Sequence, residues 1–272
     1  MLIKTKKELD ILKKDGQVLG QILANLSKIC VSGKNTWEID KKAEELILKA
    51  GGKPAFKNYQ GDPRDLPFPS TICACINDQI VHAIASKKVV LRDGDIFTID
   101  IGMEKNGLFT DTAITLAIGE IPSSTKELMR VTKQSLEEGI KAVRPGNSVA
   151  DIGKAIENYV KSQGKYGIVR DLVGHGVGHG VHEDPVIPNY YDRKLENFKL
   201  KPGMVLAIEP MITTGDWRIK DGPDGFSIDT ADGSLCAHYE HTVIVTEEGC
   251  EVITRRPGEE KEIIDKVLNP KF

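Results

Sequence analysis

The chain has 272 residues, 40% hydrophobic and 28% charged, so it can bury a sizeable core as one large domain or two small ones. Its net charge of -3, with lysines and glutamates interspersed, argues against a nucleic acid or an anionic membrane as the main partner. Five cysteines without C-x-x-C spacing predict free thiols, and the lack of a signal-peptide core or of any run near ~20 apolar residues predicts a cytoplasmic protein.

Helices are predicted at the start of each half of the chain. "TKKE" at Thr5 has the pattern of a capping box, and a second helix is predicted to begin at a cap on Thr36. A proline-rich connection, residues 54–69, then leads to the strand-like run "STICACIN". In the second half, Ser124 begins another capping-box pattern, and Ser148 is predicted to cap a fourth helix.

These elements form an internal repeat. "VSGKNTWEIDKKAEELILKAGGK" matches "VRPGNSVADIGKAIENYVKSQGK" at a constant offset of 112 residues, and "LRDGDIFTID" matches "LKPGMVLAIE". We interpret the repeat as two helix-plus-strand halves that face each other across a pseudo-twofold axis. The expected fold class is therefore α+β, with functional sites on the seam between the halves.

Both repeated strands end in a carboxylate. Asp100 and Glu209 follow apolar runs, where a charge needs a cation, several donors or a metal. Asn106-Gly107 predicts a two-residue hairpin in which Asp100 is opposite Ala113, so that Asp111 lies on the same face as Asp100. The hairpin alone leaves two interpretations open, a metal site or a solvated polar face.

The stretch "GHGVGHGVHEDP" holds three of the six histidines. His175 and His179 have the i, i+4 spacing of metal-binding helices, but Gly176 replaces the expected glutamate, and each interior glycine costs a helix roughly 1 kcal/mol relative to alanine. We therefore predict extended chain or a loop. By itself such a loop is more often a structural turn than a metal site, so the other ligands must come from elsewhere.

A final motif, "CAHYEHT", places Glu240 between Tyr239 and His241 in a β-rich run. Glu240 completes a set of four carboxylates and one imidazole, which suits a pair of Mn, Fe, Co or Zn ions better than one tetrahedral zinc. Two such ions, about 3.5–4 Å apart, can bind one water between them and lower its pKa. The full candidate set is Asp100, Asp111, His175, Glu209 and Glu240.

Together, "TIDIGMEKNGLFTDTAIT", "GHGVGHGVHEDP", "PGMVLAIEPM" and "CAHYEHT" resemble, in order and spacing, the type I methionine aminopeptidases of the pita-bread fold, peptidase family M24. The resemblance implies two helix-plus-strand halves around a curved antiparallel sheet, with helices on its outer face. It also implies that Asp100 chelates one divalent ion, that Asp111 and Glu240 bridge a pair, and that His175 and Glu209 complete the second site. Glu209 would also be the proton shuttle.

The resemblance separates the histidines by role. His82, in "QIVHAI", and His182 would stand just outside the metals as catalytic residues that contact the scissile carbonyl and the substrate backbone. His179 falls at a variable position of the family and is expected to be neither ligand nor catalyst. His238 and His241 are interpreted as structural.

The methionine side-chain pocket is the least typical part. The resemblance places Phe68 and Cys73 on one side of this pocket and Val181 and Phe226 on the other. The family commonly has an aromatic residue at the position of Val181 and a tryptophan at that of Phe226. We therefore expect the chemistry of the family with looser selection of the first side chain.

The expected function is removal of the initiator methionine from nascent polypeptides whose second residue is small. A proline-directed aminopeptidase or dipeptidase uses the same ligands but usually carries an extra N-terminal domain, and a metal-free binding module usually lacks several ligands. We expect one catalytic domain, residues 1–254, and a C-terminal extension, residues 255–272. The expected partners are nascent N-termini, with the ribosome as a candidate, no specific nucleic acid, no membrane and a monomeric state.

Overall fold

The computed structural model describes residues 3–62 and 64–259, a mixed α and β structure whose paired strands are antiparallel. The helices are α1 (Lys6–Ser27), α2 (Thr36–Lys49), α3 (Ser123–Lys141) and α4 (Val149–Gln163), with a 3-10 turn, η1 (Arg193–Leu195). The strands are β1 (Lys53–Pro54), β2 (Ile72–Ile76), β3 (Gln79–Val81), β4 (Ile96–Lys105), β5 (Leu108–Ala117), β6 (Gly167–Ile168), β7 (Gly174–Gly176), β8 (Glu183–Ile187), β9 (Val205–Ile208), β10 (Met211–Thr213), β11 (Ile219–Asp221), β12 (Ile228–Thr230), β13 (Cys236–His238), β14 (His241–Val245) and β15 (Cys250–Val252).

Two of the four predicted helix starts are confirmed. Thr5 and Glu8 form the capping box of α1, and Ser148 bonds the carboxylate of Asp151 at the start of α4. The prediction for α2 was wrong by one residue, because the Asn35 amide oxygen accepts the hydrogen bond from the helix and Thr36 is already helical. The capping box at Ser124 was also wrong: α3 begins one residue earlier, after a proline, without a side-chain cap.

The internal repeat is visible in the structure, but the helices correspond at an offset of 113 residues rather than 112. The N-caps Asn35 and Ser148 are 113 residues apart, and at this offset the buried side chains of α2 coincide with buried positions of α4. Equivalent backbone bonds recur as well, from Gly33 N to Leu91 O at 2.9 Å and from Gly146 N to Leu200 O at 3.1 Å. The identities at 112 fall on different helix faces, so burial defines the repeat better than residue identity.

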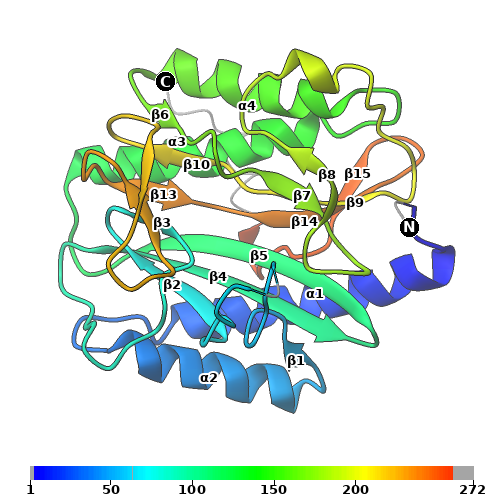
Figure 1. The fold of residues 1–272 in the computed structure, drawn as a ribbon. Coiled ribbons are helices and arrows are strands. Elements are labelled where there is room, and N and C mark those ends of the chain that lie inside the picture. The colour runs from blue at the N-terminus through cyan, green and yellow to red at the C-terminus, as the bar shows by residue number, and fades with distance from the viewer. Residues whose placement is uncertain (1–2, 63, 260–272) are drawn as a thin grey trace.

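Each half contributes one sheet, and the two sheets meet at the centre of the molecule (Figure 1). The first sheet has the order β1-β4-β2 with β5 on β4, and the second has the order β15-β14-β9-β7-β8. The seam is closed by Glu240, whose backbone N donates to Ala113 O at 3.0 Å and whose O accepts from Ala113 N at 3.4 Å. Thr242 strengthens the seam, because its Oγ1 accepts from Asp111 N and donates to Asp111 O.

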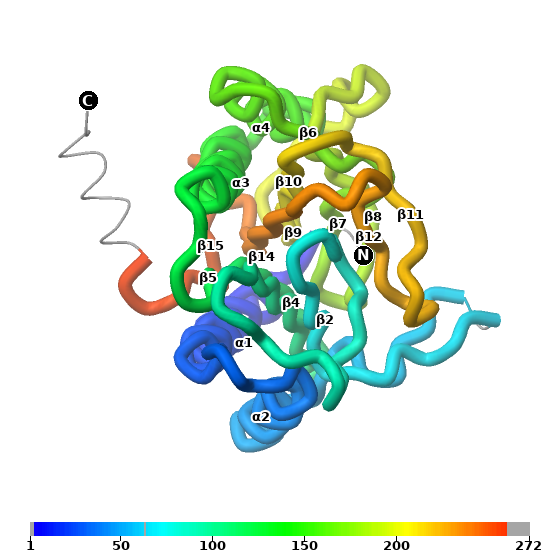
Figure 2. The backbone as a smooth tube through the Cα atoms, turned by 90° about the vertical axis from the view of Figure 1, so that its left-hand side faces the viewer, coloured from blue at the N-terminus to red at the C-terminus, as the bar shows by residue number. Residues whose placement is uncertain are grey.

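The helices cover the sheets in pairs. Helices α1 and α2 pack on the first sheet through Leu23, Ile39 and Ile99, and α3 and α4 pack on the second through Ile152 and Ile208. Seen from the side, the two helix pairs lie below and above the strands, and the chain around residue 60 lies with β11 and β12 on the other side (Figure 2). This layering leaves that side of the curved sheet to form the site.

The end of the described chain contacts the domain closely. The Arg255 guanidinium bonds the carboxylate of Glu137 on α3, and Arg256 bonds Glu259 and lies 3.4 Å from Ala113 O. The predicted domain limit at residue 254 stays a prediction, and most of the predicted extension, residues 260–272, lies outside the described residues. All five cysteines are free, as predicted. In the described part of the chain, no helix is long and apolar enough to cross a membrane.

Candidate metal and active site

The β4–β5 hairpin has the geometry predicted from its turn. Asn106 and Gly107 both have positive φ, 55° and 76°, which is the backbone of a tight two-residue hairpin turn. Asp100 pairs with Ala113 across the ladder, and Asp111 pairs with Gly102. Asp100 and Asp111 therefore lie on the same face of the hairpin, next to the seam.

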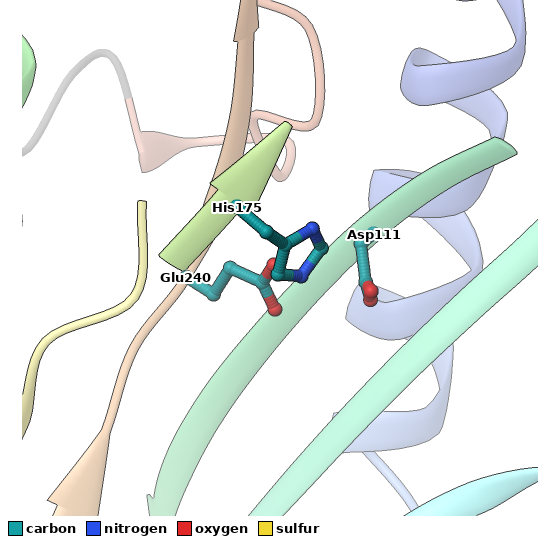
Figure 3. Close-up of side chains that lie close together, drawn as sticks. All are labelled: Asp111, His175 and Glu240. Atoms are coloured by element: carbon teal, nitrogen blue, oxygen red, sulfur yellow. The ribbon is translucent and has the colours of Figure 1, made fainter. Parts of the chain in front are cut away.

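Asp111, His175 and Glu240 come together across that seam. One ligand atom of each lies within 4.8 Å of the other two, and all three residues are buried. They come from different elements: Asp111 from β5, His175 from β7, and Glu240 from the connection between β13 and β14 (Figure 3). Side chains so far apart in the sequence meet here because β5 and the chain at Glu240 are hydrogen-bonded neighbours.

Glu209 adds a second carboxylate from the second half. It follows β9, and its Oε1 lies 3.5 Å from His175 Nε2. His175 Nδ1 lies 2.9 Å from Gly176 O and therefore carries the hydrogen, because a carbonyl can only accept. The lone pair of Nε2 is then directed toward Glu209 and is available to a metal.

The four carboxylates create a strongly acidic, buried cluster. Burial raises the pKa of Asp100 to about 6 and that of Glu209 to about 8, and it raises the pKa of Asp111 and Glu240 further from the usual range, with help from the neighbouring carboxylates. Asp100 Oδ1 and Glu240 Oε1 are buried without a hydrogen-bond partner among the described residues. Divalent cations fit this donor set, because they would satisfy these oxygens and neutralise the mutual repulsion.

The cluster forms the floor of a cavity of about 940 Å³. His82 and His182 stand on its wall and remain reachable by solvent. His82 has a left-handed backbone, with φ of 60°, directly after β3. The His182 ring packs edge-on against that of His175, with centroids 4.6 Å apart, and its Nδ1 lies 2.9 Å from the Tyr59 hydroxyl. Both predicted catalytic histidines thus border the carboxylate floor.

The cavity keeps these imidazoles neutral at physiological pH. Desolvation by the surrounding walls lowers the pKa of His82 to about 4 and also lowers the pKa of His182. The pKa of His175 is lowered to about 4 for the same reason. Neutral imidazoles can ligate a metal or donate a hydrogen bond without adding a charge.

An apolar pocket opens beside the histidines. Phe68, Cys73 and Phe226 line the cavity, and the rings of Phe68 and Phe226 pack edge to face with centroids 5.8 Å apart. Val181 is buried in the same apolar cluster, behind the wall, together with Phe56. The four predicted pocket residues therefore form one cluster, in which Val181 acts as support.

Sequence reasoning missed two neighbours of the site. Nothing in the sequence around Tyr59 distinguishes it from other aromatic residues of the proline-rich connection. His238, interpreted as structural, lies with its Nε2 3.5 Å from Glu209 Oε2. His179 and His241 lie elsewhere: His179 Nε2 contacts Glu8 at 2.8 Å, and His241 Nδ1 contacts Thr254 at 3.0 Å.

Comparison with known proteins agrees with this geometry. Residues 10–247 match the model of metallopeptidase family M24. A methionine aminopeptidase of Clostridium acetobutylicum is 42% identical over 254 residues, covering 93% of this chain and 98% of the relative. The structure of a Thermotoga maritima methionine aminopeptidase, 40% identical, superposes with a TM-score of 0.88 and covers 94% of this chain and 100% of that one.

A more distant structure shows the fold alone. The prolidase of Pyrococcus horikoshii is 22% identical with a TM-score of 0.73, and the match covers 95% of this chain but only 65% of the prolidase. The predicted pita-bread architecture is thus confirmed, as is the predicted resemblance. The chain belongs to metallopeptidase family M24 and, within that family, to the methionine aminopeptidases.

Proposed function

We propose that this protein hydrolyses the first peptide bond of polypeptides that begin with methionine and continue with a small residue. The observation that carries the proposal is the floor of the cavity, where four carboxylates and a neutral imidazole converge beside an apolar pocket. The family membership supports the same reaction. Nascent polypeptide N-termini are the substrate class.

The floor residues would hold two divalent ions, with Mn, Fe, Co or Zn as candidates. Asp100 would chelate one ion, His175 and Glu209 would complete the other, and Asp111 and Glu240 would bridge them. The proximity of Asp111, His175 and Glu240 and the unpartnered oxygens of Asp100 and Glu240 support this assignment. When bound, such ions polarise a carbonyl and lower the pKa of water.

Glu209 is the proton carrier in this proposal. Its carboxylate faces the cavity, and burial alone raises its pKa to about 8. A carboxyl group with so high a pKa can hold a proton near neutral pH and then release it to a departing amine. Its contacts with His175 and His238, both at 3.5 Å, fix its position.

His82 and His182 bind and orient the peptide. If the Tyr59 hydroxyl donates to His182 Nδ1, then His182 Nε2 carries the hydrogen and can donate it to a substrate carbonyl. His82 is held in a left-handed turn on the same wall, so the two imidazoles can grip the backbone on either side of the scissile bond. Phe68, Cys73 and Phe226 then receive the methionine side chain, with Val181 behind them.

Hydrolysis of short peptides tests the proposal. Protein loaded with Mn or Co should cleave Met-Ala-Ser, should not cleave Ala-Pro peptides, and should not cleave Met-Ala-Ser with an acetylated amine. Chelation should abolish cleavage, and metal analysis should approach two ions per chain. Turnover of Ala-Pro peptides in preference to Met-Ala-Ser would contradict the assignment. A monomeric state, a cytoplasmic location and ribosome contact stay predictions.

A further inference from the structure

Glu183 organises the short loop that leads from metal ligand His175 to His182. Its Oε1 accepts a hydrogen bond from Gly180 N at 3.0 Å and another, shorter one from His179 N. The carboxylate is thus turned back into the loop that its own strand, β8, follows. Because His182 lies between these bonded amides and Glu183, this bonding fixes the chain on both sides of the catalytic imidazole.

The other oxygen of Glu183 is bonded by a residue from the far end of the chain. Lys4 Nζ lies 2.7 Å from Glu183 Oε2, and the two side chains are only 1% and 15% exposed. Burial opposes ionisation of Glu183, but the bonds from Lys4 and the loop amides outweigh it and lower its pKa. The carboxylate is therefore a fully bonded buried anion whose countercharge is Lys4.

The backbone of Lys4 is itself anchored. Its N donates to Gly203 O at 2.9 Å, and Ile3 forms a β-bridge with Met204, just before β9. The segment that precedes α1 therefore lies on the turn that leads to the strand of Glu209. The ammonium reaches Glu183 from a fixed position, as a positioning group must.

Gly178 shows how closely the lysine stem passes beneath the loop. A Cβ added at Gly178 would lie 2.5 Å from Lys4 Cε and 3.3 Å from its Nζ. The φ of Gly178, 132°, is also one that other residues rarely adopt. The glycine in "GVGHG" is thus required by the lysine, and the two segments fit as a matched pair.

We propose that Lys4 is a positioning residue for catalysis: through Glu183 it holds the loop that presents His182 to the substrate. The inference rests on the proposed function, because it assigns Lys4 to that reaction. Removing the ammonium leaves a buried carboxylate without its cation, and the loop must loosen to hydrate it. Metal binding should change little, since His175 is held in β7 by its own pairing with β9.

A second contact to the same loop should matter less. His179 Nε2 lies 2.8 Å from Glu8 Oε1, but the two side chains are 30% and 27% exposed. Exposed ion pairs contribute little because water screens them. The comparison between Lys4 and His179 therefore separates the buried contact from mere proximity to the loop.

The test uses the metal-loaded full chain. Lys4→Met keeps the stem and removes the charge, Lys4→Arg restores the charge, and Lys6→Met is the matched control, since Lys6 is exposed on the first turn of α1. We expect Lys4→Met to lower kcat on Met-Ala-Ser ~10-fold or more with KM and metal content nearly unchanged, and Lys4→Arg to recover most of the loss. Glu183→Gln added to Lys4→Met should cost less than the two single changes combined, because the pair acts as a unit.

Amide hydrogen exchange provides a readout independent of activity. The amides of His179 and Gly180 should exchange ~10-fold faster or more in Lys4→Met, while those of β9 keep their protection. Equal loss of protection in the loop and in β9 would show a general destabilisation and overturn the proposal, as would a kcat within about twofold of Lys6→Met. Failure of the unmodified protein to cleave Met-Ala-Ser would instead overturn the proposed function, and the exchange comparison would still test the role of Lys4 in the loop.

Discussion

Asp111 lies beside Asp100 on one face of the β4–β5 hairpin because its cross-strand partner is Gly102, two residues beyond Asp100. The glycine leaves space that Phe56 fills: a Cβ at Gly102 would lie 2.7 Å from the ring of Phe56. An apolar ring thus packs next to two carboxylates and reduces their contact with water. The hairpin register and the ring together explain why the pKa of Asp100 and of Asp111 is raised.

The assignment of His175 as a ligand is tested by its removal. His175→Ala should lower metal affinity at least ~10-fold, because one nitrogen donor is lost from a buried site. His179→Ala is the matched control, since that imidazole contacts Glu8 at the surface. Calorimetric titration with Mn checks the prediction, and equal affinities in the two variants would contradict it.

His82 and His182 should affect turnover without affecting metal content. Replacement of either by alanine should lower kcat ~10²-fold or more, as loss of a positioned hydrogen-bond donor does. Tyr59→Phe should have a smaller effect in the same direction, because it removes the hydroxyl at 2.9 Å from His182 Nδ1 but leaves the imidazole. Metal analysis beside steady-state kinetics measures both quantities. A metal-depleted His182→Ala protein would argue against this division of roles.

The stability of the metal-free protein should fall as the pH rises through neutrality. Burial raises the pKa of Glu209 from 4.5 to about 8, so between these values the unfolded chain has released a proton that the folded protein retains. The free energy of unfolding therefore decreases with rising pH up to about pH 8. The buried histidines do not contribute above their unfolded pKa of 6.5, since His82, His175 and His238 are neutral in both states there.

Thermal unfolding of EDTA-treated protein between about pH 7 and 8 measures this effect. Tm should decrease over that interval, and Glu209→Gln should reduce the slope. Added Mn should raise Tm more at the higher pH, because binding displaces protons from the carboxylates. A Tm that rises with pH in the metal-free protein would contradict the prediction.

The pocket should select the first side chain less strictly than its second neighbour. Val181 and Phe226 are smaller than the aromatics usual in the family, so peptides beginning with norleucine, and to a lower extent leucine, should be cleaved. Phe226→Trp should raise the preference for methionine over leucine by about threefold or more, since added bulk in an apolar pocket discriminates by one to a few kcal/mol. Competition between tripeptides with different first residues gives the ratio directly. An unchanged ratio would remove Phe226 from the specificity pocket.

The second substrate residue would lie at the rim near His82 and His182. We expect Met-Ala, Met-Gly and Met-Ser peptides to be cleaved well and Met-Lys or Met-Phe poorly, because a bulky group would meet the two imidazoles. Relative kcat/KM over a series varied only at the second residue measures this effect. Indifference to the size of that residue would contradict the proposed position of the peptide.

The hairpin and the set of floor residues could be predicted from sequence because their signals are local. Asn106-Gly107 specifies a turn, a turn specifies a register, and the register places Asp100 and Asp111 on one face. Helix starts were predicted less well, since several polar residues near Thr36 and Ser124 can cap a helix and packing decides between them.

Contacts between distant segments could not be predicted. Tyr59 meets His182, and Lys4 meets Glu183, through side chains separated by more than a hundred residues. A single sequence holds no periodicity or motif for such pairs, because they depend on how the two halves dock. The offset of the repeat was wrong for a related reason: identities between two amphipathic helices arise on any face, and only burial in the folded chain shows which faces correspond.

The division of ligands between the two halves has a consequence for how the active protein comes into being. Asp100 and Asp111 belong to the first half, whereas His175, Glu209 and Glu240 belong to the second. Neither half possesses enough donors to retain an ion, and the carboxylates of each half repel those of the other until a cation arrives. Ion capture thus reports completed assembly: a chain with its halves still apart is an inert peptide, and hydrolytic capacity appears only when the seam closes.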